Sequence, residues 1–139
     1  MEYYQFNLSV PTGTNATIWQ TFGQFRDAPG IRRSHLFEGR YENIYIPRSR
    51  IPAVEPVLDA ACEVVARILA CRPAELGVGF WFNEMSPGDV TLLHSHDDDD
   101  EMLSGVYYVR TPPGCGDLEL GSGEQCRLIR PVEGRLVLF

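Results

Sequence analysis

Two histidines and a run of acidic residues lie together in the segment LLHSHDDDDE, residues 92–101. His94 and His96 are two positions apart, so a β-strand would point both imidazoles to the same face. Neutral imidazoles bind iron, zinc, copper and nickel well, and two of them with one carboxylate leave coordination positions open for a substrate or dioxygen. The acids from Asp97 to Glu101 can supply that carboxylate. The simpler alternative is that the histidines end a strand and the acids form a solvated turn.

Two sets of metal ligands compete within this segment. In one set His94 and His96 both bind the cation; in the other, Asp98 replaces one histidine, because the H-x-D spacing is present as well. Two of the three histidines in the chain lie here, and five adjacent acids repel one another unless a cation offsets their charge. An EF-hand calcium loop fits poorly, because DDDD lacks its alternating ligands and central glycine. We therefore expect a transition-metal site whose candidate ligands are His94, His96 and Asp98.

The composition restricts the classes of partner. The net charge is −7, and the sequence has no run of clustered lysine and arginine of the kind that phosphate binding needs, so we expect no nucleic-acid partner. No apolar stretch is long enough to span a membrane, and the first ten residues lack the pattern of a signal peptide. The four cysteines have no C-x-x-C spacing. We expect no membrane partner and a cytoplasmic location.

The part of the chain before residue 77 is expected to contain the helices. Strands are predicted at 2–10 and 42–47, and a short helix at 15–30 with Trp19 and Phe22 on one side. A clearer helix covers 52–70, where apolar residues recur at steps of three and four. Its expected buried face is formed by Val54, Val57, Leu58, Ala61, Cys62, Val65, Ile68 and Leu69.

From residue 77 onward the apolar period falls toward two, which predicts strands that turn residues separate. The predicted strands are 77–85, 89–96, 102–110, 117–121, 125–131 and 135–139. We therefore expect an α+β fold in a single domain, residues 1–139. An N-terminal strand and helix part (1–76) would cover a β core (77–139) of the sandwich or barrel type.

The sequence of this β core resembles a known enzyme family. FWFNEMSPGDVTLLHSHDDDDEMLSGVYYV, followed by PPGCGDLEL and IRPVEGRLVLF, is similar to the double-stranded β-helix (jelly-roll, cupin-like) core of the 2-oxoglutarate/Fe(II)-dependent oxygenases. The shared features are a W-x-N strand, H-x-H, S-G-V-Y-Y and P-x-x-G-x-L-V-x-F, all within residues 80–139.

The resemblance implies that Fe(II) is bound by His94 together with His96 or Asp98, that 2-oxoglutarate binds beside it, and that a small-molecule or peptide substrate is hydroxylated. It also implies a contact between Tyr108 and 2-oxoglutarate, unless Tyr108 is simply an interior aromatic residue. Asn83 would reach the same cavity if it faces inward; otherwise it is an ordinary polar strand residue.

The sequence departs from the family pattern at its end. The third family ligand, a histidine, and the basic residue that binds 2-oxoglutarate both follow the strand that here ends at Phe139. We therefore expect the natural polypeptide to continue. The remaining histidine, His35, precedes the main helix and is a poor substitute.

Two alternatives stay open. Gly88, His94, His96 and Glu101 fit G-x5-H-x-H-x4-E, which resembles the first cupin motif and would make Glu101 a ligand in a metal enzyme without 2-oxoglutarate. The second alternative is a non-catalytic binding module in which HSHDDDDE forms a surface loop. The sequence does not indicate an oligomeric state.

Overall fold

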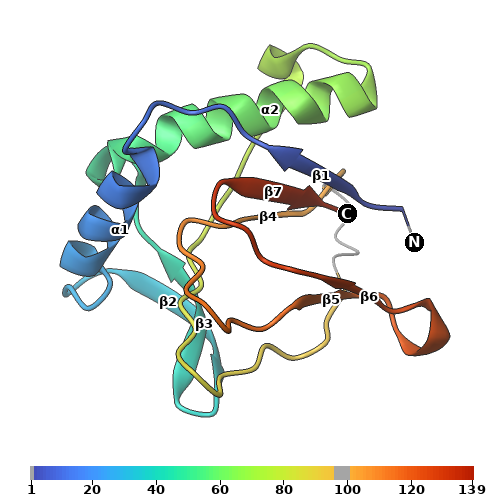
Figure 1. Ribbon diagram of the computed structural model, residues 1–139. Helices are drawn as coiled ribbons and strands as arrows, with labels where there is room; N and C mark the ends of the chain where they lie inside the picture. The colour runs from blue at the N-terminus through green and yellow to red at the C-terminus, as the bar shows by residue number, and fades with distance from the viewer. Residues whose placement is uncertain (1, 96–100) are drawn as a thin grey trace. The chain divides into compact units, whose positions relative to one another are not determined.

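The computed structural model describes residues 2–95 and 101–139 and has a mixed α+β fold (Figure 1). Two α-helices and small antiparallel sheets make up the regular structure of these residues. The chain divides into two compact units. The first unit is formed by Met1–Ser9 and His94–Phe139, and the second unit by Val10–Leu93.

The two helices belong to the second unit. Helix α1 (Thr14–Phe25) follows Gly13, whose φ of 86° lies in the left-handed region that glycine adopts without strain. The Thr14 hydroxyl donates a hydrogen bond of 2.7 Å to the Pro11 carbonyl at this end. Helix α2 (Glu55–Leu69) follows the 3-10 turns η1 (Arg48–Arg50) and η2 (Pro52–Val54) and is followed by the 3-10 turn η3 (Pro73–Glu75). Both predicted helices are therefore present.

The buried faces of the helices differ in detail from those predicted. In α1 the buried positions are Thr14, Ile18 and Phe22, and Trp19 is 38% exposed. Its ring still approaches Phe22, with centroids 6.4 Å apart. In α2 the buried residues are Val57, Leu58, Val64 and Ala66.

A hairpin of β2 (Arg32–Phe37) and β3 (Arg40–Tyr45) completes the regular structure of the second unit. The strands are antiparallel, with Phe37 paired to Arg40 across the two-residue turn Glu38-Gly39. Both turn residues have positive φ, as a type I′ hairpin turn requires. Strand β3 corresponds to the prediction at 42–47, whereas β2 was not predicted, because RRSHLF lacks a clear apolar alternation.

The strands predicted at 77–85 and 89–96 are wrong for the described residues up to 95. The chain there is irregular except for one antiparallel bridge, in which Ile44 and Phe82 exchange backbone hydrogen bonds of 2.9 and 2.8 Å. A local turn replaces strand pairing: the Ser86 amide donates to the Asp89 carboxylate at 2.7 Å, and the Asp89 amide donates to the Ser86 carbonyl at 3.0 Å. Side chains that bond nearby backbone in this way compete with sheet formation.

The first unit contains the other predicted strands in shorter form. Strand β7 (Arg135–Leu138) lies between β1 (Tyr4–Asn7) and β4 (Gly105–Tyr107) in an antiparallel sheet of order β1-β7-β4 (Figure 1). A separate antiparallel pair is formed by β5 (Leu118–Leu120) and β6 (Arg127–Ile129), followed along the chain by β7. A short 3-10 turn, η4 (Gly123–Gln125), joins β5 to β6.

A compact apolar cluster lies between the strands of the first unit. Val137 of β7 is fully buried against Leu120 and Ile129, and the partly buried residues packed on them are Tyr3, Tyr108, Leu118 and Phe139. Strand β4 approaches β7 closely at Gly105, where a Cβ atom would lie 2.9 Å from the Leu138 side chain. Strand β7, which this cluster buries at Val137, in turn pairs with β4.

Candidate functional site

The structure describes one of the three predicted metal ligands. His94 is the first residue after the boundary at Leu93, and its side chain is exposed in irregular backbone, not in the strand that the H-x-H argument assumed. His96 and Asp98 lie outside the described residues. Among the described residues, no three histidine, cysteine, aspartate or glutamate side chains come together as a metal-binding group.

Glu101 is anchored to the start of the β4 region. Its carboxylate accepts a hydrogen bond of 2.6 Å from the Ser104 hydroxyl. Ser104 is itself buried and exchanges backbone hydrogen bonds of 2.9 and 3.0 Å with Phe139, which extends the pairing of β4 with β7. A carboxylate oriented by a hydroxyl is the kind of outer contact that supports metal ligands. The position therefore suits the role that the cupin alternative gives to Glu101.

Tyr108 follows β4 and is positioned by the same strands. Its amide donates to the Arg135 carbonyl at 3.1 Å, and its carbonyl accepts from the Gly134 amide at 2.8 Å. The side chain is half-buried against the apolar cluster of the first unit. Burial, with smaller effects of Cys115 and Asp117, raises the pKa of Tyr108 above its ordinary value. The phenol therefore stays protonated and can donate a hydrogen bond over the whole neutral range.

Asn83 belongs to the second unit, where its amide is engaged by neighbours. The Asn83 Oδ1 accepts a hydrogen bond of 2.7 Å from Arg40, and its Nδ2 donates to the Thr91 hydroxyl at 3.4 Å. These contacts give Asn83 a role in fixing the segment that leads to His94. A contact with 2-oxoglutarate stays a prediction.

Arg40 forms a polar cluster that was not predicted. Besides Asn83, its guanidinium bonds the Glu84 carbonyl at 3.2 Å and lies 3.6 Å from the carboxylates of Glu42 and Asp89. Arg40 and Glu42 are both mostly buried, and the Oε1 of Glu42 has no hydrogen-bond partner within the described part of the chain. The feature of the sequence that could have pointed to this cluster is the Glu38-Gly39 pair. A turn predicted there would have placed Arg40 at the start of a hairpin strand.

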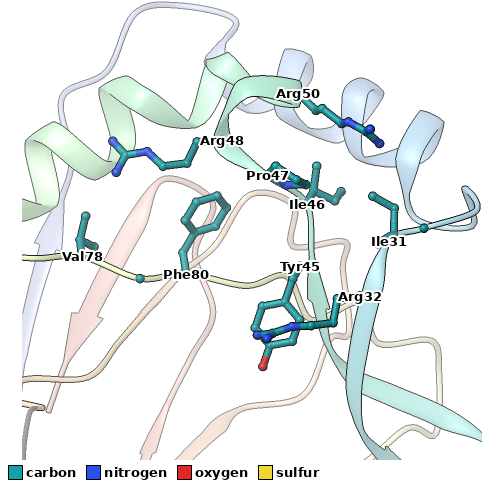
Figure 2. Close-up of a pocket in the computed structure, with 11 residues that line it drawn as sticks. Ile31, Arg32, Tyr45, Ile46, Pro47, Arg48, Arg50, Val78 and Phe80 are labelled. Atoms are coloured by element: carbon teal, nitrogen blue, oxygen red, sulfur yellow. The ribbon is translucent and has the colours of Figure 1, made fainter.

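A pocket of about 430 Å³ opens in the second unit (Figure 2). Residues from three segments line it, at 30–32, 45–50 and 78–80. Six of the twelve arginines of the chain lie between residues 26 and 50, although the net charge of the whole chain is −7. Three of them, Arg32, Arg48 and Arg50, line this pocket.

Comparison with known proteins adds no identification: no protein-family model, curated protein or solved structure matches this chain. In the described residues, the helices are too short or too polar to cross a membrane.

The types of side chain that the first unit offers as metal ligands suit Fe(II), the ion that the family resemblance implies. His94 offers an imidazole and Glu101 an oriented carboxylate, and both are ligands that Fe(II) accepts.

Proposed function

We propose that this chain is a non-haem Fe(II)- and 2-oxoglutarate-dependent oxygenase that hydroxylates a small-molecule or peptide substrate in the cytoplasm. Its β strands would belong to a double-stranded β-helix. The proposal depends on one observation: the HSHDDDDE segment leads directly into the SGVYY strand, and that strand pairs with the GRLVLF strand. This is the order in which the resembled family joins its metal-binding segment to its barrel.

The pairing of β4 with β7 supports the proposal. Gly105 pairs with Leu138 and Tyr107 with Leu136, so the residues after the acidic segment are held by a buried strand. Since Glu101 is tied to Ser104 only one residue before β4, the metal-binding segment would have a fixed end on the sheet. Fixed ligands bind a metal more tightly than ligands in a free loop, because less conformational entropy is lost on binding.

Each residue of the site has a specific role in this proposal. His94, with His96 or Asp98, would hold Fe(II), which together with 2-oxoglutarate supplies the activation of dioxygen for attack on a C–H bond. The protonated phenol of Tyr108 would donate a hydrogen bond to a carboxylate of 2-oxoglutarate. Its position beside the apolar cluster would exclude water from that contact.

The cupin alternative remains the second candidate because of the Glu101–Ser104 contact. If Glu101 is a ligand in place of Asp98, the same segment would hold a metal without 2-oxoglutarate. The two candidates therefore differ in one carboxylate and in one cosubstrate, and both differences can be measured.

Anaerobic titration of the whole chain with Fe(II), followed by calorimetry, tests the metal site. We expect one Fe(II) per chain and a loss of at least tenfold in affinity in His94→Ala. His35→Asn is the matched control, since asparagine tolerates the left-handed backbone of His35, where φ is 61°. Asp98→Asn should weaken binding in the oxygenase if Asp98 is the ligand beside His94, and Glu101→Gln should weaken it in the cupin alternative. Equal affinity in all four variants and the parent chain would exclude the site.

A further inference from the structure

The pocket of the second unit is built from segments that are distant in the sequence but tied together. The bridge between Ile44 and Phe82 fixes the 78–82 segment beside β3. Aromatic contacts reinforce the bridge: the rings of Trp81 and Tyr45 have centroids 6.4 Å apart, and those of Phe80 and Phe82 are 5.7 Å apart in an edge-to-face arrangement. The pocket walls are therefore held by backbone and ring contacts together, which is what a preformed site needs.

The inner surface of the pocket is apolar. Ile31 and Ile46 are almost fully buried beneath it, and Phe80 is half-buried at its centre (Figure 2). Val78 is 39% exposed at the edge. A pocket of about 430 Å³ lies within the size range of small-molecule sites, which are mostly apolar with a few oriented polar groups.

The charge of the pocket is positive, although the chain as a whole is acidic. Its lining contains three arginines and no aspartate or glutamate. Arg48 is neutralised by Glu55, to which its Nε donates at 2.8 Å. Arg32 and Arg50 have no salt bridge within residues 2–95 and 101–139; Arg50 instead lies 5.8 Å from the centroid of the Phe25 ring.

Arg32 is the cation of the lining that stacks on an aromatic side chain of the same pocket. In Figure 2 its guanidinium lies against the ring of Tyr45, whereas Arg48 and Arg50 extend to opposite sides. The Arg32 Cζ is 4.0 Å from the centroid of that ring. A guanidinium has five N–H donors, so an arginine held by one aromatic residue still has in-plane N–H groups for an anion, and stacking restricts its rotation before a ligand arrives.

The hydroxyl of Tyr45 is fixed in turn. It lies 3.0 Å from the Ser34 hydroxyl and accepts a hydrogen bond of 2.9 Å from the Asn43 amide. Partial burial by itself would raise the pKa of Tyr45, but the hydrogen bonds of Ser34 and Asn43, together with the charge and the side-chain hydrogen bond of Arg32, lower it below its ordinary value. The Tyr45 ring is therefore a rigid support for Arg32.

We propose that this pocket binds a small organic anion, with its carboxylate or phosphate group on the Arg32 guanidinium and an apolar or aromatic body against Ile46 and Phe80. The inference is independent of the oxygenase proposal, because it depends only on residues of the second unit. The net charge of −7 makes the site selective: an anion meets repulsion over much of the chain and a net positive lining at this pocket.

Calorimetric titration of the whole chain with four probes tests the inference: phenylacetate, phenyl phosphate, the neutral phenylacetamide and inorganic phosphate. We expect saturable binding of phenylacetate or phenyl phosphate, at least about tenfold tighter than the binding of phenylacetamide or inorganic phosphate, because only the first two probes have both charge and an apolar body. Which of the two binds more tightly identifies the anionic group.

Two variants with the same change of charge locate the binding. Arg32→Gln should weaken the preferred probe about tenfold, whereas Arg67→Gln, which removes an exposed arginine of α2, should leave it unchanged. Circular dichroism of both variants checks that the fold is retained. Equal binding of the acid and its amide would overturn the inference, as would equal losses in the two variants. So would the absence of saturable binding below about 10 mM. Binding of phenylacetate that persists in His94→Ala separates this pocket from the proposed metal site.

Discussion

Replacing Arg40 should destabilise the second unit more than replacing any exposed arginine. The side chain of Arg40 is 18% exposed and that of Glu42 is 12% exposed, so both charges are mostly out of water. In Arg40→Met the aliphatic part of the side chain is retained, but the cation beside Glu42 is lost. The hydrogen bonds to Asn83 and to the Glu84 carbonyl are lost with it.

The expected cost follows from these contacts. Loss of a charge-assisted hydrogen bond costs about 1.5–3 kcal/mol, and an unpaired buried charge about 3–5 kcal/mol. Because the distance from Arg40 to Glu42 is 3.6 Å and both keep some exposure, we take the lower part of this range. We expect the free energy of unfolding to fall by about 3 kcal/mol.

Urea unfolding followed by circular dichroism and by tryptophan fluorescence measures this change, and coincident transitions confirm two-state behaviour. Arg72→Met, at an arginine that is 81% exposed, is the control and should show no measurable loss. In the Arg40→Met background, Glu42→Gln should restore about 1 kcal/mol, because it removes the charge that was left unpaired. A loss below about 0.5 kcal/mol in Arg40→Met would refute the account of the cluster.

Two further predictions concern the first unit. Gly121→Ala should lower the free energy of unfolding by about 1–3 kcal/mol, because Gly121 has a φ of 85° and a Cβ there would lie 2.9 Å from the Gln125 carbonyl oxygen. Chemical unfolding measures the loss, and a neutral effect would contradict the described backbone. Tyr108 should make stability depend on pH in the alkaline range. Its pKa is raised in the folded chain from the ordinary value of 10.0, so the unfolded chain loses the proton first and stability falls as the pH rises above 10.0. Tyr108→Phe should flatten this fall above pH 10.0, and an unchanged slope would show that Tyr108 is not half-buried.

The sequence predicted the elements whose apolar pattern is strong. The helix at 52–70 has apolar residues at helical spacing, and the strands at 117–121 and 135–139 alternate or are continuously apolar; all three are present in shorter form. The side chains of these elements are buried mainly by apolar contact. The spacing of apolar residues along the sequence shows which side chains make such contacts.

The errors lie where polar side chains bond the backbone. The segment 77–95 has the composition of strands, but the turn of Ser86 and Asp89 and the contacts of Arg40 hold it in irregular backbone. The contacts of Arg40 with Asn83 and Glu84 join residues more than forty positions apart, and periodicity carries no information about them. The same reason explains why the pocket beside Arg32 was not predicted.

The spacing of the histidines and acids in the sequence could predict which types of ligand the candidate metal site offers, but not where those side chains lie. The position of His94 is now described, and so is the anchoring of Glu101, which was an open alternative at the level of sequence. His96 and Asp98 lie outside the described residues, so their part in the site stays a prediction.

The most direct measurement of the oxygenase proposal is optical. Fe(II) and 2-oxoglutarate are added to the anaerobic chain separately and together, and the visible spectrum is recorded for the parent chain, His94→Ala and His35→Asn. The proposal predicts an absorption band that needs both additions, is retained in His35→Asn and is lost in His94→Ala. A chain that binds Fe(II) through His94 but gives no band with 2-oxoglutarate would contradict the oxygenase and favour the cupin-type metal site.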